Sequence, residues 1–188
     1  TEENTLNNKK GARRAQERQT DPVNKRWNQL AKSLSDTTAA LATALEEGEL
    51  TPALQAQARA LTDWFNAEPR QHHLDEEKHV FPSLLASNQE DVLQATHRLI
   101  QDHGWLEADW FEIEPALEAA ADGNSWFDPN VLRQAVEVFQ QLYLDHIVLE
   151  ESLAYPEARG RIDPALLESM GREMAKRRAV RDAKAAKA

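Results

Sequence analysis

Three histidines of the chain are each followed, four residues later, by a glutamate. The pairs are His72 and Glu76, His103 and Glu107, and His146 and Glu150. On a helix, residues four apart lie about 40° from each other and so point from the same face. Imidazole nitrogens and carboxylate oxygens are common metal ligands in proteins. The pairs are therefore candidates for a metal site if they lie on helices whose faces converge.

Two of these pairs belong to an internal repeat. The segments 72–82 and 146–156 carry His, Glu, Glu, an aromatic residue and Pro at the same offsets, 74 residues apart. A repeat of this length is typical of a duplicated helix–loop–helix unit, so we expect approximate two-fold symmetry. Three pairs, two of them in a matched repeat, favour metal binding over a purely structural polar network.

The elements that must position these pairs are predicted to be helices. Helical periodicity runs through almost every long segment and strand-like alternation is absent, which indicates an all-α protein. We expect four long helices: from just after Pro22 to Gly48, from Thr51 to about Pro82, from about Glu90 to Ala121, and from Asp128 to before Pro156. Short connections indicate an antiparallel four-helix bundle, followed by a C-terminal helical extension that begins at Asp163-Pro164.

The apolar stripes of the expected helices predict which way the pairs point. His72 lies seven residues after Phe65 and His146 seven residues after Phe139, so both histidines continue an apolar stripe. The His103 pair is in phase with Leu99. Buried unpaired groups of this kind would cost several kcal/mol each, a penalty that a bound metal ion removes. Three imidazoles and three carboxylates without a thiolate suit iron or manganese.

Composition and charge exclude several other functions. The 188 residues include no cysteine, which rules out disulfides, zinc–thiolate sites and iron–sulfur clusters. The net charge of −10 comes from an acidic body between basic ends, which is not typical of a nucleic-acid-binding domain. The basic ends could contact an acidic protein partner, although solvated tails are favoured. Without a membrane-length apolar run or a signal peptide, we expect a cytoplasmic protein without membrane contact.

We divide the chain into three parts. Residues 1–22 are predicted to be a disordered polar and basic arm, 23–160 the four-helix bundle, and 161–188 a basic C-terminal helix or tail. All candidate ligands lie in the second part.

The bundle region resembles the hemerythrin-like, HHE cation-binding domain over about residues 26–160. The similarity is carried by the two His-x-x-x-Glu-Glu…aromatic-Pro segments and by Asp102-His103. It implies a four-helix bundle with a non-haem di-iron centre, holding two iron ions per chain or one, with manganese less favoured. Carried over by position, the ligands would be His72, Glu76, His103, His146 and Glu150. Glu107 stands where oxygen-carrying members have a further histidine.

The sequence departs from the family pattern on the first helix, where relatives usually have a histidine. No histidine precedes His72. Gln29 would lie about 160° from the apolar stripe, and Thr38 lies on the stripe but offers only a hydroxyl. We therefore expect a carboxylate-rich site with open positions, which favours redox or sensing chemistry over reversible oxygen carriage.

The resemblance implies a non-haem iron protein that binds oxygen, nitric oxide or peroxide in sensing, iron handling or stress response. We expect a metal- and oxygen-binding protein rather than a turnover enzyme, and assign no catalytic residue. One alternative is a di-iron repair or oxidase-type enzyme that uses the same centre. The other is a metal-free helical interaction module that contacts partners through its basic ends.

Neighbouring polar residues receive lesser roles. His73 lies about 100° from the inner face and is expected beside the ligands or at the surface, and His79 at the rim. Glu77 and Glu151 could bridge metals or hydrogen-bond a ligating imidazole. His97 is expected to be exposed. Aromatic residues assigned to the core are Tyr143, whose hydroxyl could also donate to bound oxygen species, and Trp64, Trp105, Trp110 and Trp126.

Overall fold

The computed structural model describes residues 22–165 and, beyond them, 168–169, 172–173, 175–176, 179 and 187. Every element in this part of the chain is helical, so the all-α prediction is confirmed. The predicted arm lies outside the described residues except for Pro22, and so does most of the predicted C-terminal tail. None of the helices in the described part combines the length and apolar character needed to cross a membrane.

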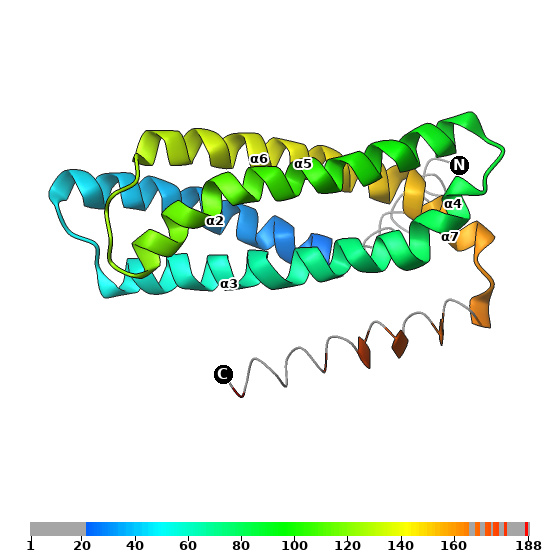
Figure 1. Ribbon diagram of the computed structural model, residues 1–188, viewed down its shortest axis with the longest axis horizontal. Helices are drawn as coiled ribbons and strands as arrows, with labels where there is room; N and C mark the ends of the chain where they lie inside the picture. Colours follow the sequence, from blue (N-terminus) through cyan, green and yellow to red (C-terminus); the bar gives the residue numbers. More distant parts are fainter. Residues whose placement is uncertain are drawn as a thin grey trace, which may run out of the picture. The chain divides into compact units, whose positions relative to one another are not determined.

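Four long helices form the bundle that the sequence predicts (Figure 1). They are α2 (Pro22–Glu47), α3 (Pro52–Asp75), α5 (Glu90–Ala121) and α6 (Pro129–Leu149). Two of them run on through a π turn into a short helix. After α3 come η1 (Glu76–Val80) and α4 (Phe81–Leu85), and after α6 come η2 (Glu150–Ala154) and α7 (Tyr155–Arg161).

Short polar side chains begin two of the long helices. The Thr51 hydroxyl accepts a hydrogen bond from the backbone N–H of Leu54 at 3.3 Å, at the start of α3. At the start of α6, Asp128 Oδ1 accepts one from the N–H of Asn130 at 2.8 Å. A proline follows each cap, at the position where its missing N–H costs least. These two helix starts were predicted from sequence and are confirmed.

Glycines end two of the long helices. Gly48 follows α2 and Gly123 lies two residues after α5, with φ angles of 82° and 81°. This left-handed conformation is accessible to glycine without the steric penalty that a Cβ brings. Both helix ends agree with the sequence expectation.

The chain divides into two compact units. One contains the described residues up to Trp64 together with Glu112–Gln140, and the other contains Phe65–Phe111 together with the described residues from Gln141 onward. The first unit buries an apolar stripe of α2 that was predicted from sequence, including Trp27, Leu34 and Leu41. All six histidines belong to the second unit, so the candidate site lies within that unit.

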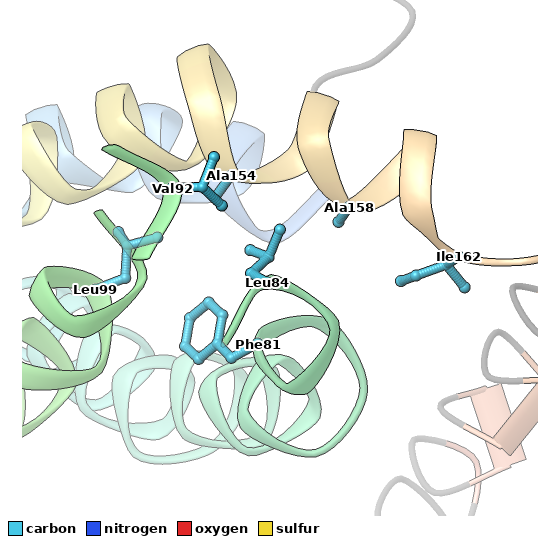
Figure 2. Packing of buried hydrophobic residues seen from close by; sticks show 7 residues of the cluster. All are labelled: Phe81, Leu84, Val92, Leu99, Ala154, Ala158 and Ile162. Atoms are coloured by element: carbon cyan, nitrogen blue, oxygen red, sulfur yellow. The ribbon is translucent and has the colours of Figure 1, made fainter. Parts of the chain in front are cut away.

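An apolar cluster packs the short helices of the second unit. It draws side chains from α4, α5, η2 and α7 and from the residue that follows α7 (Figure 2), namely Phe81, Leu84, Val92, Leu99, Ala154, Ala158 and Ile162. Burial of these side chains holds the two segments that come after the π turns against each other. Two of the candidate ligands, Glu76 and Glu150, lie in the π turns that precede these segments.

Neither repeat proline ends its helix, contrary to our expectation for Pro82 and Pro156. Proline normally breaks a helix, because it lacks an N–H and its ring collides with the carbonyl four residues earlier. A π turn precedes each proline and changes the bonding to a five-residue spacing. The N–H of Phe81 bonds to the carbonyl of Glu76, and that of Tyr155 bonds to the carbonyl of Glu150. The chain therefore continues as α4 and α7.

The tryptophans do not all enter the core. Trp110 is buried as expected, and Trp64 is half-buried, but Trp105 and Trp126 expose 57% and 69% of their surface. The core assignment was therefore wrong for these two. Trp105 lies about 100° from its buried neighbour Leu106 on α5, and Trp126 lies in the connection before α6.

Candidate metal centre

Five polar side chains from three long helices and their extensions meet inside the second unit. His72 lies on the buried face of α3, His103 comes from α5 and His146 from α6. Glu76 and Glu150 are the first residues of the two π turns. Each of the five is at most 7% exposed. Groups that can carry charge are rarely buried to this degree unless they are paired or bind a metal.

The three imidazoles direct the same ring nitrogen, Nε2, at the two carboxylates. Nε2 of His72 lies 2.6 Å from Glu76 Oε1, and Nε2 of His103 lies 3.1 Å from Glu76 Oε2. Nε2 of His146 lies 2.5 Å from Glu150 Oε1. One ligand atom from each of Glu76, His103, His146 and Glu150 lies within 4.8 Å of the others. Four donors of two chemical kinds thus surround one small volume.

The donor set fits iron. The Nε2 atoms of His103 and His146 are buried and face carboxylate oxygens without the alignment of a hydrogen bond. Imidazole lone pairs and carboxylate oxygens that face each other in this way can share a cation between them. Nitrogen and oxygen donors without sulfur suit iron or manganese rather than a zinc–thiolate site.

Two of the rings are held from behind by further carboxylates. Nδ1 of His103 lies 2.9 Å from Glu77 Oε1, and Nδ1 of His146 lies 3.4 Å from Asp102 Oδ2. A carboxylate on Nδ1 fixes the orientation of the ring and leaves Nε2 available to a metal. One of the two roles expected for Glu77, a hydrogen bond to a ligating imidazole, thus has the geometry it needs. The role of Asp102 was missed, because no sequence pattern pairs it with a histidine on another helix.

Electrostatics in the cluster favour charge on Glu76 and His146. Burial by itself would raise the pKa of Glu76, but the charge of His72 and the close contacts of Glu76 with His103 and His72 hold that pKa well below its usual value. Burial would likewise lower the pKa of His146. Its contacts with the carboxylates of Asp102 and Glu150 outweigh burial and raise the pKa to about 9.

The pKa values of Glu150 and His73 shift in the direction that favours the neutral form of each group. Burial, together with repulsion from the carboxylate of Glu76, raises the pKa of Glu150 despite its contact with His146. Burial and the neighbouring ring of His103 lower the pKa of His73 well below the usual histidine value. The cluster thus limits its own charge, as a buried set of ionisable groups must when no metal balances it.

His73 lies closer to the cluster than its position on the helix predicted. Its ring stacks on that of His103 with centroids 4.0 Å apart and meets the ring of His146 edge-on at 5.6 Å. Ligand atoms of these three histidines also lie within 4.8 Å of one another. Because α3 faces both α5 and α6 at this level, two adjacent residues, His72 and His73, point inward.

Glu107 does not join the cluster, and the prediction that it faces inward is wrong. Its side chain is 54% exposed and its Oε1 lies 3.5 Å from Nη2 of Arg70. The buried stripe of α5 continues from His103 through Leu106 and Trp110. Leu106 takes the inward position, and Glu107, one residue later, is rotated by about 100° towards solvent.

Three other candidates lie close to where the sequence placed them. His97 is exposed. His79 is partly buried, with Nε2 3.2 Å from Oε2 of Glu173. Tyr143 is buried, and its ring centroid lies 6.4 Å from that of His146.

Tyr155 also lies in the cluster, although its sequence position predicts nothing for it beyond a place in the repeat. Its hydroxyl lies 2.7 Å from Glu76 Oε1, 2.9 Å from Glu150 Oε2 and 3.2 Å from Nε2 of His72. The signal that could have found it is the repeat itself. Tyr155 is the aromatic residue that precedes proline in the second copy, and Phe81, without a hydroxyl, occupies that place in the first.

Comparison with protein families gives one match. The sequence model described as the hemerythrin HHE cation binding domain matches residues 18–158. The matched range contains all five buried residues of the cluster and both copies of the repeat. Comparison with curated proteins finds no match.

Proposed function

The chain belongs to the hemerythrin HHE cation-binding family, and we propose that it binds iron at the buried cluster of its second unit. The ligands in this proposal are His72, Glu76, His103, His146 and Glu150. The observation that carries it is the convergence of three Nε2 atoms on two buried carboxylates. Two carboxylates, each with two oxygens, provide enough donors for two ions to share a ligand.

Residues around the proposed ligands fix the orientation of their rings and limit the access of water. Glu77 and Asp102 orient the rings of His103 and His146 through Nδ1. The apolar cluster next to the site brings the ring of Phe81 to 5.4 Å from that of His103, centroid to centroid, which keeps water from one side of the donors. Ligands positioned in this way need little rearrangement when a metal enters.

We further propose that the iron centre binds oxygen or a related small molecule, such as nitric oxide or peroxide, in a sensing or stress-response role. Iron supplies the electrons and the open coordination positions for such binding. The site has fewer histidines than those of oxygen carriers: no histidine precedes His72, and Glu107, which stands where those carriers have a further histidine, faces solvent. Two of the five proposed ligands are carboxylates. Oxygen donors stabilise the oxidised metal, which favours a redox response over reversible carriage.

Iron loading tests the proposal directly. The purified full chain is loaded with iron(II) under anaerobic conditions, its metal content is measured, and it is then exposed to air. We expect about two iron ions per chain and, after air, a new charge-transfer absorption in the near-ultraviolet and visible range. One bound ion would indicate a single-iron site. A chain that retains no iron would contradict the proposal.

A further inference from the structure

The hydroxyl oxygen of Tyr155 lies among the donors of the proposed iron centre. Three of its contacts are to Glu76, Glu150 and His72, at 2.7, 2.9 and 3.2 Å. Those three residues come from both copies of the repeat, and all three are at most 3% exposed. The phenolic oxygen therefore lies at the point where the two halves of the donor set meet.

The hydrogen-bonding capacity of a phenol does not match this position. The hydroxyl has a single hydrogen, so it can donate to Glu76 or to Glu150 but not fully to both. The other contact then brings oxygen lone pairs together, unless a carboxyl is protonated or a cation lies nearby. An oxygen surrounded by two carboxylates and an imidazole nitrogen has the neighbours of a metal ligand.

Comparison of the two repeat copies separates the hydroxyl from the packing role of the ring. Phe81 and Tyr155 both come directly after a π turn and both precede a proline. Phe81 fills this corner with an unsubstituted ring inside the apolar cluster. An aromatic ring without a hydroxyl is thus sufficient at this position of the first copy, and the Tyr155 hydroxyl of the second copy contacts the polar site.

We propose that Tyr155 is a further iron ligand, bound through its phenolic oxygen beside His72, Glu76 and Glu150. This inference rests on the proposed iron site. When the oxygen–iron bond forms, the O–H bond breaks and its proton leaves to solvent, so that no oxidant or reductant is needed. The phenolate adds an oxygen donor to a chain in which no histidine precedes His72.

Spectroscopy of the iron(III) protein tests this ligand without relying on an activity. Phenolate bound to iron(III) gives a visible charge-transfer band, and excitation in that band enhances the ring vibrations of the bound tyrosine in the Raman spectrum. The chain has only two tyrosines, Tyr143 and Tyr155. We expect Tyr155→Phe to lose the band and the ring vibrations and to bind iron about ten-fold more weakly or worse. Tyr143→Phe, the matched control, should keep both signals.

The possible results separate this inference from the proposed function. Iron-loaded wild-type protein without tyrosine vibrations would overturn the ligand assignment and leave the iron site standing. Vibrations lost in Tyr143→Phe and kept in Tyr155→Phe would also overturn it. A wild-type chain that binds no iron would overturn both proposals. Should Tyr155→Phe not fold, the Tyr143→Phe protein contains Tyr155 as its only tyrosine, and tyrosine vibrations in that protein would themselves support the assignment.

Discussion

The ring of His146 shows how a single side chain is prepared for a metal. It is 1% exposed, its Nδ1 faces Asp102 and its Nε2 faces Glu150. Both nitrogens therefore have an assigned partner, one that orients the ring and one that shares the site. Changes at His146, at its orienting partner and in its protonation should each affect metal binding in a distinct way.

Replacing His146 or Glu150 by alanine should weaken iron binding by about ten-fold or more, since even the loss of an outer partner of a ligand reaches this size. Metal content after dialysis and the air-induced absorption would measure the effect. His97→Ala is the control, because His97 is exposed. Equal metal retention in all three variants would show that the site lies elsewhere.

Asp102→Asn should lower metal affinity by about 10- to 100-fold without removing a ligand, because an amide orients the imidazole of His146 less strongly than a carboxylate. Competition with a coloured chelator would measure the change. Asp145→Asn removes an exposed carboxylate one residue before His146 and should leave affinity unchanged. Identical affinities for the two variants would mean that the contact between Asp102 and His146 has no part in binding.

Metal affinity should rise with pH. The pKa of His146 is raised to about 9 in the metal-free chain, so below that pH its Nε2 holds a proton that the metal must displace. The raised pKa of Glu150 acts in the same direction. Calorimetry with Co²⁺ between about pH 6 and pH 8 should show tighter binding and fewer released protons at the higher pH. A Co²⁺ affinity that does not change over this pH range would contradict the conclusion that Nε2 of His146 holds a proton in the metal-free chain.

At the scale of elements, the two π turns determine the path of the chain after Glu76 and Glu150. Each turn adds one residue to the helical path, so that a proline can come next without a break. The same turn sets the rotation of the aromatic residue relative to the glutamate five positions earlier. In the second copy this rotation brings the Tyr155 hydroxyl to both carboxylates.

Ser152 lies within the second π turn. Its deletion should therefore lower the stability of the fold and disrupt the metal site. The turn would then have four residues in place of five, and the ring of Pro156 would collide with the carbonyl one α-helical turn earlier. This collision should lower the free energy of unfolding by about 3 kcal/mol. Tyr155 would rotate by about 100° relative to Glu150. Thermal unfolding and iron content would both report the change, while Ser152→Ala keeps the length and should resemble wild type. An unchanged melting temperature after the deletion would show that the turn has no structural role.

For the whole molecule, the cluster couples folding to metal. The folded chain gathers the donors, and the unfolded chain disperses them, so bound metal stabilises the folded state. At a free metal concentration about 100 times the dissociation constant, the gain is about 2.7 kcal/mol. Iron-loaded protein should melt several degrees above the chelator-treated protein. Equal melting temperatures would favour the metal-free interaction module instead.

Much of the fold could be predicted from the sequence because it depends on local interactions. The caps at Thr51 and Asp128, the glycines after α2 and α5, and the helical periodicity each act over a few residues. The spacing of His72 from Glu76 and of His146 from Glu150 is also local, since residues four apart share a helix face. The structure brings these four together with His103, and their role as ligands remains a prediction.

The tertiary structure decided the orientation of residues next to the predicted ones. Glu107 and Leu106 are adjacent on α5, and only the packing of neighbouring helices determines that the leucine faces inward. His73 points into the cluster because α3 contacts two helices at that level. Tyr155 and Asp102 meet partners far away in the chain. Helical phase defines a face only to within one residue, and the surrounding helices select which of two neighbours occupies the interior.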